Sequence, residues 1–491
     1  MSCKPKLSFL ENLALQNGHK YLFGTFLFLL ILVSCSDNAE ENPSPNAEGE
    51  KINIFFVNDM HGQLENFAKI KHIVDQAKAE TPSILVSAGD LFSGSPYVDQ
   101  YTEPGFPMID IMNKTGFDVS VLGNHEFDYG LDELQERIDE SQFDWVCANI
   151  EASGTARNQP DAYTTVEVGG IRVTFLGLVE TYGREGVVAP AAHPWRMRGL
   201  TFQDHKDIVD QYADLKVDEN ADAYIALTHL GTIRDIILAN SNSFLDGIIG
   251  GHSNDINVNY FNDIPVVMAG ANLAYLGKLE LTVNNKEVVA SNVSMISLSA
   301  YQEKDEVLEE AISVYLDNPA FDTVVGVSET EMDELGEVGC FFTAALKERL
   351  DVDMAIQNLG GLRSPIDQGE ITALEIYQLD PFNNQSVIYE LTVSEFKRFL
   401  VENNGEMAFS GIDLSFSGAD YEFRDETGTL LDDSATIRLG MNNFIPALYD
   451  NFFSYEATDI KDVTTAETLI EYLDLIQNTV NFEGCERQIT F

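Results

Sequence analysis

A short apolar run that ends at a glycine, followed at once by polar residues, most constrains how this chain can fold. Residues 119–122 read Val-Ser-Val-Leu, and Gly123, Asn124, His125 and Asp128 come directly after them. The run predicts a buried strand, and in open α/β sheets functional side chains follow the carboxyl ends of the strands. Asn124 offers an oxygen to a metal, His125 offers a proton or a nitrogen, and Asp128 could orient the imidazole. Alone, the segment would also suit a turn with a solvated histidine.

The same pairing of an apolar run with a polar cluster recurs along the chain. Further strands are predicted at residues 52–57, 83–88, 223–228 and 247–249. The polar residues that follow these runs include Asp59 and His61, Asp90, His229, and His252 with Asn254. A single Asp in such a place is usually a helix cap, and a single His is usually a surface residue. Because the pairing occurs five times and takes up four of the eight histidines, the sequence predicts one site built from several strand ends.

Helical periodicity separates these strands. Residues 64–77 predict an amphipathic helix, and residues 108–112 lie in a second helix. Residues 171–178 and 264–268 are further strands, and residues 276–298 predict a closing hairpin. Strands that alternate with helices indicate an α/β fold with a layered sheet.

The five polar blocks together resemble those of a known enzyme superfamily. They read Asp59-Met60-His61, Gly89-Asp90, Gly123-Asn124-His125-Glu126, His229 and Gly251-His252-Ser253. In order and spacing they resemble the calcineurin-like metallophosphoesterases, and Phe127-Asp128 narrows the resemblance to the 5'-nucleotidase branch, which includes UDP-sugar hydrolases and 2',3'-cyclic nucleotide phosphodiesterases. The resemblance implies an N-terminal four-layer αββα sandwich, the metallophosphoesterase domain, at residues 51–300. A linker helix at 301–324 and a C-terminal α/β (α+β) substrate-binding domain at 325–491 would follow.

The resemblance also implies two divalent metal ions as cofactors. The first would be held by Asp59, His61 and Asp90, and the second by Asp90, Asn124, His229 and His252. The shared Asp90 would bridge the ions, because two cations about 3.5–4 Å apart repel each other and need an anion between them. Asn254 stands where the family has His or Gln as a further ligand of the first ion, and its side chain is shorter than Gln. This mixture of donors suits zinc, manganese or iron better than calcium.

The chemistry implied by the resemblance is hydrolysis of a phosphate ester. The ions would activate a water, and the resulting metal-bound hydroxide would attack the phosphorus. His125, oriented by Asp128, would stabilise the developing charge or protonate the leaving oxygen. The expected activity is that of an exported 5'-nucleotidase acting on nucleoside 5'-phosphates. A 2',3'-cyclic nucleotide phosphodiesterase or a UDP-sugar hydrolase is the alternative, and a non-catalytic surface binding protein is a further one.

Segments of the C-terminal half resemble the second, substrate-binding domain of 5'-nucleotidases. In residues 358–363, which begin with Asn358, paired glycines that include Gly361 would let the backbone approach a ligand, and Arg363 would bind phosphate. Without that context the segment would be a tight turn beside a surface cation. Residues 381–384, which read Pro-Phe-Asn-Asn, carry part of the same resemblance.

Two aromatic residues are expected to hold the nucleoside base. By the resemblance, Phe409 and Phe444 would stack on either side of it, although either residue could instead belong to the core. The family's glycine-rich loop after the second aromatic is replaced by Ile-Pro-Ala-Leu-Tyr-Asp at residues 445–450. This difference leaves the identity of the leaving group open.

The charge balance narrows the range of partners. The chain has 29 Lys and Arg against 80 Asp and Glu, a formal net charge of −51. Nucleic acid is therefore not an expected partner, because its binding relies on cationic neutralisation of phosphates. An anionic nucleotide could still bind, because divalent metals reverse the charge locally.

The N-terminus predicts export and anchoring. Residues 1–35 have lysines followed by an apolar run and Cys35, which resembles the end of a bacterial lipoprotein signal peptide. An ordinary signal peptide or a short anchor is the alternative. Residues 36–50 are acidic and would form a tether. We expect a monomer, lipid-anchored to the outer membrane of a bacterial envelope and facing periplasm or surface, in which Cys340 and Cys485 could pair.

Overall fold

The computed structural model describes residues 48–184, 186–417, 420–454, 457–476 and 479–491. The predicted signal peptide and residues 36–47 of the predicted tether lie outside the described residues. Among the helices that are described, none has the length and apolar character needed to cross a bilayer.

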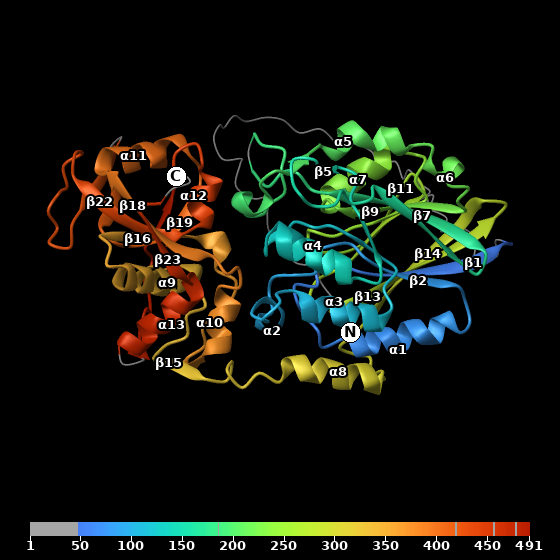
Figure 1. Cartoon of the computed structure of the whole chain (residues 1–491), viewed down its shortest axis with the longest axis horizontal. Coiled ribbons are helices and arrows are strands. Elements are labelled where there is room, and N and C mark those ends of the chain that lie inside the picture. Colours follow the sequence, from blue (N-terminus) through green and yellow to red (C-terminus); the bar gives the residue numbers. More distant parts are fainter. Residues whose placement is uncertain (1–47, 185, 418–419, 455–456, 477–478) are drawn as a thin grey trace, which may run out of the picture. The chain divides into compact units, whose positions relative to one another are not determined.

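The N-terminal half is built on two six-stranded sheets (Figure 1). In order, the first sheet consists of β14 (Glu287–Ser297), β13 (Tyr275–Asn284), β1 (Glu50–Val57), β2 (Ser83–Ser87), β3 (Val119–Val121) and β4 (Asp144–Val146). The second consists of β11 (Ile256–Phe261), β12 (Ile264–Ala269), β10 (Gly247–Ile249), β9 (Ala223–His229), β7 (Ile171–Val179) and β6 (Tyr163–Val168). Strands β1 to β4 run parallel, as do β7, β9, β10 and β12. The short strands β5 (Ile150–Glu151) and β8 (Thr201–Phe202) pair separately.

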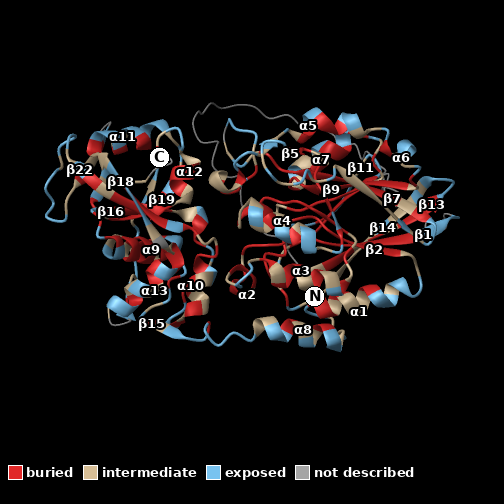
Figure 2. Ribbon diagram, in the orientation of Figure 1, coloured by how far each residue is buried: buried red, intermediate tan, exposed pale blue. Residues whose placement is uncertain are grey.

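The two sheets pack face to face, and helices cover both outer faces. Along β1, Ile54 and Phe56 face the second sheet, whereas Phe55 and Val57 face the helices, as the two-residue period of a strand requires. The outer layer of the first sheet consists of α1 (Phe67–Lys78), α2 (Pro96–Asp99), α3 (Phe106–Thr115), α4 (Leu131–Glu140) and α8 (Glu306–Leu316). The second sheet is covered by α5 (His205–Ile208), α6 (Leu215–Asp218) and α7 (Thr232–Ser241). The buried residues lie along the strands and on the inner sides of these helices (Figure 2), which confirms the predicted αββα sandwich.

The C-terminal half is centred on a third six-stranded sheet of mixed direction. Its order is β23 (Asp459–Thr464), β18 (Gln385–Thr392), β22 (Thr436–Asn442), β16 (Met354–Asn358), β19 (Glu406–Gly411) and β25 (Gln488–Thr490). One face is covered by α9 (Leu335–Leu350), α10 (Ala373–Leu379) and α13 (Thr465–Leu475), and the other by α11 (Val393–Glu402) and α12 (Phe444–Leu448). A small sheet of β17 (Gly369–Thr372), β15 (Val324–Ser328) and β24 (Thr479–Val480), and a hairpin of β20 (Asp413–Ser417) and β21 (Asp420–Arg424), complete it. The predicted second α/β domain is thereby confirmed.

The linker helix predicted at residues 301–324 is wrong in its length. The helix there is α8, which ends at Leu316, and residues 317–323 form turns before β15. Pro319 explains the end, because a proline disfavours the helical conformation of the residue before it. Leu308 and Ile312 are buried in the outer layer of the first sheet, so α8 packs on the sandwich and is not a free-standing connector.

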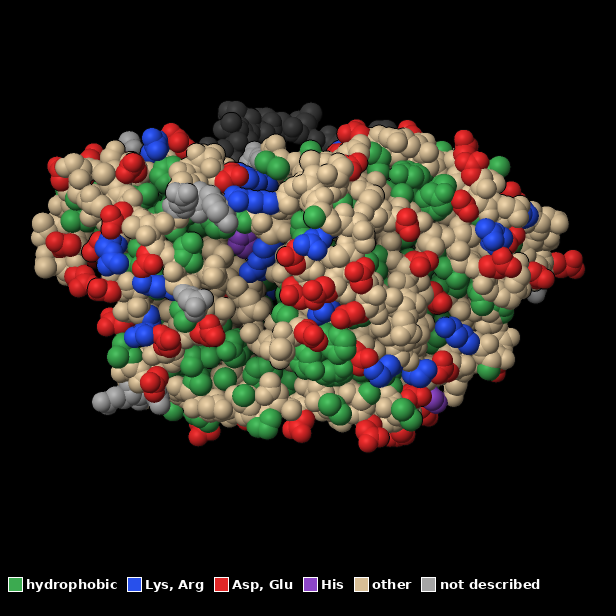
Figure 3. Space-filling view, in the orientation of Figure 1, with side chains coloured by type: hydrophobic (Ala, Val, Ile, Leu, Met, Phe, Trp, Pro, Cys, Tyr) green, Lys and Arg blue, Asp and Glu red, His purple; other side chains and the backbone are tan. Residues whose placement is uncertain are grey.

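Acidic side chains are spread over the whole face seen in Figure 3 and do not gather in one patch. Near the middle of this face, cationic side chains and a histidine come together. On this face the negative charge is therefore dispersed, and the cationic side chains lie together among it.

Candidate active site

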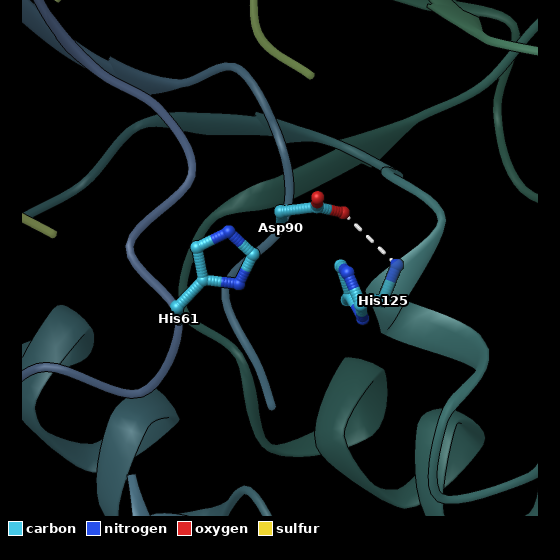
Figure 4. Close-up of side chains that lie close together, drawn as sticks. All are labelled: His61, Asp90 and His125. Carbon is cyan, nitrogen blue, oxygen red and sulfur yellow. Dashed lines mark hydrogen bonds between the residues drawn. The ribbon is translucent and has the colours of Figure 1, made fainter. Parts of the chain in front are cut away.

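The five predicted strand ends meet at one edge of the sandwich. Neighbouring strands β1, β2 and β3 bring Asp59, Asp90 and Asn124 together, and β9 and β10 bring His229 and His252 from the facing sheet. Two groups of potential ligand atoms result, each with its atoms within 4.8 Å of one another: His61, Asp90 and His125, and Asp90, His229 and His252. In Figure 4, His61 and His125 lie on either side of Asp90. The carboxylate of Asp90 belongs to both groups, as expected for a bridge.

Five of the predicted metal ligands have a left-handed backbone. The φ angles are +50° at Asp59, +49° at His61, +54° at Asp90, +80° at His252 and +56° at Asn254. This region is unfavourable for residues with a side chain, and such strain is concentrated at functional sites. The loops are therefore held in a conformation that serves the placement of these side chains.

Two glycines allow the loops to approach one another. A Cβ atom on Gly123 would lie 2.3 Å from Asp90 Oδ1, and one on Gly251 would lie 2.5 Å from the Ala88 carbonyl oxygen and 2.8 Å from His229 Nδ1. Any side chain at either position would displace a residue of the two ligand groups. The glycines of the sequence blocks thus serve close packing around the site.

In His229 and His61, a hydrogen bond at Nδ1 orients the ring so that Nε2 faces the site. Nδ1 of His229 lies 2.7 Å from the Ala88 carbonyl oxygen, and Nδ1 of His61 lies 3.1 Å from the carbonyl oxygen of Ser93. Since each Nδ1 faces a carbonyl oxygen, each Nε2 is the ring nitrogen left for the site, and it becomes a ligand atom when it gives up its proton. His229 Nε2 is buried, 3.0 Å from Asp90 Oδ2, and makes no well-formed hydrogen bond. An orphaned ring nitrogen that faces a carboxylate is the arrangement a metal ion would complete.

Asn124 joins the second group through its side-chain oxygen. Its Nδ2 donates to the Ala191 carbonyl at 3.2 Å, and its Oδ1 lies 2.9 Å from His252 Nδ1. The amide oxygen therefore lies beside the His252 ring, and its role as a metal ligand stays a prediction.

Asp59 and Asn254 are placed differently from the sequence expectation. Both Asp59 oxygens lie 3.0 Å from the His252 backbone nitrogen, and Asp59 Oδ1 is 3.9 Å from His229 Nε2. The group around His61 therefore contains His125 where Asp59 was expected. Asn254 is exposed, and no hydrogen bond of its side chain occurs among the described residues. The ligand roles of Asp59 and Asn254 remain predictions.

The charges of the site are strongly coupled in the absence of metal. Burial disfavours the imidazolium of His229, but the Asp90 and Asp59 carboxylates outweigh it and raise the pKa of His229 to about 10. Burial acts against the carboxylate of Asp90, and His229 nevertheless holds the pKa of Asp90 well below its usual range. Burial raises the pKa of Asp59 to about 6. Anionic and cationic groups are thus packed together where water cannot screen them.

The Glu126 side chain connects the loop that carries Asp90 to the loop that carries Asn124 and His125. Its carboxylate accepts hydrogen bonds from the Asp90 nitrogen at 3.0 Å, from the Leu91 nitrogen at 2.6 Å and from the nitrogen of Gly123. The residue is completely buried. Its role is structural, because it holds the Asp90 loop against the loop that carries Asn124 and His125.

His125 and Asp128 form the predicted pair. His125 Nδ1 lies 2.6 Å from Asp128 Oδ2, and the His125 backbone nitrogen donates to Asp90 Oδ1 at 2.9 Å (Figure 4). Burial lowers the pKa of His125, but Asp128 and Asp90 outweigh this effect and raise it to about 9. The ring is fixed through Nδ1, so Nε2 is the atom left to meet a substrate.

A cavity of about 230 Å³ adjoins this pair and is lined by residues from both halves of the chain. Its lining comprises Asn124, His125, Asp128, Ala191, Ala192, His193, Arg196, Asn358, Gly360, Gly361, Arg363, Phe382, Asn384 and Phe444. The structure thus brings four of the five predicted substrate-binding residues to the cavity: Asn358, Gly361, Arg363 and Phe444. Asn442 donates hydrogen bonds to Gln357 Oε1 and Asn358 Oδ1, and so fixes the segment that carries Asn358.

Phe409 contradicts the prediction that it stacks on the base. It lies on β19, is buried in the core with Phe396 and Phe399, and does not line the cavity. Phe382 occupies the cavity wall instead, with the Arg363 guanidinium 5.6 Å from its ring centre. The sequence carries a signal for Phe382, since residues 381–384 are part of the resemblance to the substrate-binding domain.

Two further cavity residues, His193 and Arg196, come from the loop between β7 and β8 and carried no signal in the sequence. His193 Nδ1 accepts from the Trp195 nitrogen, and its Nε2 lies 3.3 Å from Asn443 Oδ1. Burial lowers the pKa of His193 to about 3, so the ring is neutral. His193 therefore presents a neutral edge beside Phe444, 5.7 Å between ring centres.

Comparisons with known proteins agree with this arrangement. The family model described as calcineurin-like phosphoesterase matches residues 52–255, and that of the 5'-nucleotidase C-terminal domain matches residues 322–453. The chain is 26% identical to the trifunctional nucleotide phosphoesterase protein YfkN of Bacillus subtilis over 90% of its own length, but it spans only 35% of that relative. It is 25% identical to a 5'-nucleotidase of Vibrio vulnificus, over 74% of this chain and 79% of the other.

Among solved structures, the fold is similar to that of a 5'-nucleotidase precursor from Thermus thermophilus. The TM-score is 0.73 and the identity 23%, with 89% of this chain and 98% of the other covered. At this identity the likeness shows a shared fold.

Proposed function

The chain belongs to the 5'-nucleotidase family of calcineurin-like metallophosphoesterases, which are phosphoric ester hydrolases, and on that premise we propose that it hydrolyses the phosphomonoester of nucleoside 5'-phosphates. One observation carries the substrate assignment. The cavity is lined both by the His125–Asp128 pair and by Arg363, Phe382 and Phe444. A phosphate and an aromatic base each find a complementary surface there.

The residues at the strand ends fit two divalent cations. Asp90 would bridge them, with His61 on one side and Asn124, His229 and His252 on the other, and Asp59 beside the pair. The unpaired His229 Nε2 and the neighbouring carboxylates supply donors that zinc, manganese or iron would accept. When bound, the two cations would supply Lewis acidity to the phosphoryl group and to the attacking water.

Arg363 would orient the phosphate ester, and His125 would donate a proton to it. Asp128 holds His125 through Nδ1, so His125 Nε2 is positioned to donate to the leaving oxygen or to a charged phosphoryl oxygen. Arg363 is exposed to the cavity, and no hydrogen bond of its guanidinium to another described residue occurs. Its fork of donors therefore remains available for a phosphate.

The aromatic residues would bind the nucleoside. Phe382 and Phe444 are both on the cavity wall, and stacking on flanking rings tolerates purine and pyrimidine bases alike. The short helix α12 begins at Phe444, and Asn442 Oδ1 accepts from the Ile445 nitrogen in its first turn at 3.1 Å. Residues of this helix stand where the family has its glycine-rich loop, and Phe444 at its start lines the cavity.

Release of phosphate from AMP tests the assignment. Chelated protein supplied with manganese or zinc is assayed with AMP, with 2',3'-cyclic AMP and with UDP-glucose. We expect AMP to give the highest kcat/KM. If only the cyclic nucleotide or the nucleotide sugar is cleaved, the chain is a phosphodiesterase or a nucleotide-sugar hydrolase. If none is cleaved with metal bound, the proposal of a nucleotidase is wrong.

We propose in addition that the chain is exported and lipid-anchored through Cys35. The sequence around Cys35 supports this, and so does the disulfide between Cys340 and Cys485, since such bonds persist in oxidising compartments. Metabolic labelling with a radioactive fatty acid should mark the wild type and leave a Cys35→Ala variant unlabelled. An unlabelled wild type would exclude the lipid anchor.

A further inference from the structure

The guanidinium of Arg196 connects the His125–Asp128 pair to Phe382, an aromatic residue that lines the cavity. Arg196 lies on the short 3₁₀ helix at Pro194–Met197 and lines the cavity. It donates to the carbonyl oxygens of Asp128, Phe382 and Asn383. Asp128 holds His125, whereas Phe382 and Asn383 lie in the turn between α10 and β18. One side chain thus connects both functional parts.

The hydrogen bonds use all four terminal N–H groups of the guanidinium. Nη1 donates to Asp128 and, at 2.9 Å, to Phe382, and Nη2 donates to Phe382 at 2.9 Å and to Asn383 at 3.0 Å. Arg196 consequently has no terminal donor left for a phosphate. Only a planar fork satisfies several carbonyl oxygens in this way, and a lysine ammonium cannot reproduce it.

The Phe382 ring also meets the catalytic pair directly. It lies nearly parallel to the His125 ring, with 6.2 Å between ring centres and 16° between planes. The same turn is tied to α2, because Gln100 Nε2 donates to Asn383 Oδ1 at 2.6 Å and Asn383 Nδ2 donates to the Asp99 carbonyl at 3.2 Å. A shift of this turn would therefore move the aromatic wall relative to His125.

We propose that Arg196 is a positioning residue that sets the distance between the Phe382 wall and the His125–Asp128 pair, and so selects phosphate esters that carry a stacked base. The inference rests on the proposed nucleotidase function and deepens it. Arg196 acts through the backbone of its neighbours and does not touch the phosphate. Its loss should therefore affect a substrate with a base more than one without.

The test compares AMP with ribose 5-phosphate in the Arg196→Lys and Arg196→Ala variants. We expect kcat/KM for AMP to fall by about 10- to 100-fold in both, which corresponds to the loss of charge-assisted hydrogen bonds. The loss on ribose 5-phosphate should be several times smaller. Arg198→Lys is the matched control, because Arg198 is exposed, lies over the Trp195 ring and does not line the cavity; it should behave as the wild type.

A double-mutant cycle with Phe382→Ala separates positioning from general stability. If Arg196 acts through Phe382, the Arg196→Lys change should cost much less AMP activity in the Phe382→Ala background than in the wild type. Added guanidinium ion should partly restore the AMP rate of Arg196→Ala. Wild-type kinetics in Arg196→Lys, equal losses on both substrates, or independent effects in the cycle would each overturn the proposal. A wild type that releases no phosphate from AMP would instead reject the nucleotidase function.

Discussion

At the scale of single residues, the site depends on side chains that share one carboxylate. Asp90 lies in both groups of potential ligand atoms, and His125 contacts it through its backbone nitrogen. Replacing Asp90 therefore disturbs both groups of ligand atoms. Replacing the His125 ring leaves the hydrogen bond between the His125 backbone nitrogen and Asp90 in place. The two residues can be told apart by experiment.

We predict that Asp90→Asn loses bound metal and that His125→Asn keeps it. The His125 variant should lose about 10²- to 10⁴-fold in kcat, the usual contribution of a general acid. Metal content by plasma mass spectrometry and AMP turnover are measured on the same samples. A His125 variant that loses metal together with activity would make His125 a ligand, as its place beside His61 and Asp90 also allows.

The buried carboxyl of Asp99 should make the free energy of unfolding depend on pH. Its carboxyl is completely buried and is hydrogen-bonded by the Tyr129 hydroxyl and, at 2.9 Å, by the Gly94 nitrogen. Burial raises the pKa of Asp99 from 3.8 to about 7. The folded state therefore binds this proton more tightly than the unfolded state, and the contribution to the free energy of unfolding is present below the unfolded pKa and is lost as pH rises to about 7.

Asp99→Asn removes this dependence. The free energy of unfolding of the variant, relative to the wild type, should rise between about pH 4 and about pH 7, by up to about 4 kcal/mol, since a tenfold change in proton affinity is worth about 1.4 kcal/mol. Urea unfolding at several pH values measures it. Curves that stay parallel over this range would contradict the prediction.

The positions of the aromatic residues could not be predicted from the sequence alone. Phe409 and Phe382 are chemically identical, and only the three-dimensional packing distinguishes a core residue from a cavity wall. Arg196 lacks any sequence signal, because its partners are backbone carbonyls far away along the chain. In contrast, Asp90, Asn124, His229 and His252 could be located from sequence because each lies at the end of an apolar strand or within three residues of it.

At the scale of elements, strands were easier to predict than helix ends. Apolar runs between polar clusters indicated β1, β2, β3, β9 and β10 to within a residue or two. Helix α8 ends at Leu316, although the predicted linker helix extended to residue 324. Helix α9 begins at Leu335. Its glycines weaken the helical signal, but Gly339 is needed where α9 packs on β19, since a Cβ there would lie 2.5 Å from that of Ala408.

The disulfide between Cys340 on α9 and Cys485 should stabilise the C-terminal half. The two residues are 145 positions apart, and closing so long a loop restricts the unfolded chain, by up to about 5 kcal/mol. We predict a lower melting temperature in the presence of a phosphine reductant, measured by circular dichroism. The Cys340→Ser/Cys485→Ser variant should melt at the lower temperature with or without reductant. Equal melting of oxidised and reduced wild type would show that the bond contributes nothing.

At the scale of the whole molecule, the two halves of the chain supply different parts of the candidate active site. The αββα sandwich gathers donors for cations, and the C-terminal sheet supplies Arg363, Phe382 and Phe444 to the cavity. The acidic side chains of this chain, whose net charge is −51, are scattered over the face seen in Figure 3. Divalent cations held at the strand ends would reverse the charge locally for the proposed nucleotide substrate.

The residues at the five strand ends should bind two divalent cations that share Asp90. Anomalous diffraction from crystals grown with manganese tests this. We predict two peaks, one on each side of the Asp90 carboxylate, with His61 beside one and His229 and His252 beside the other. A single peak, or peaks away from Asp90, would contradict it.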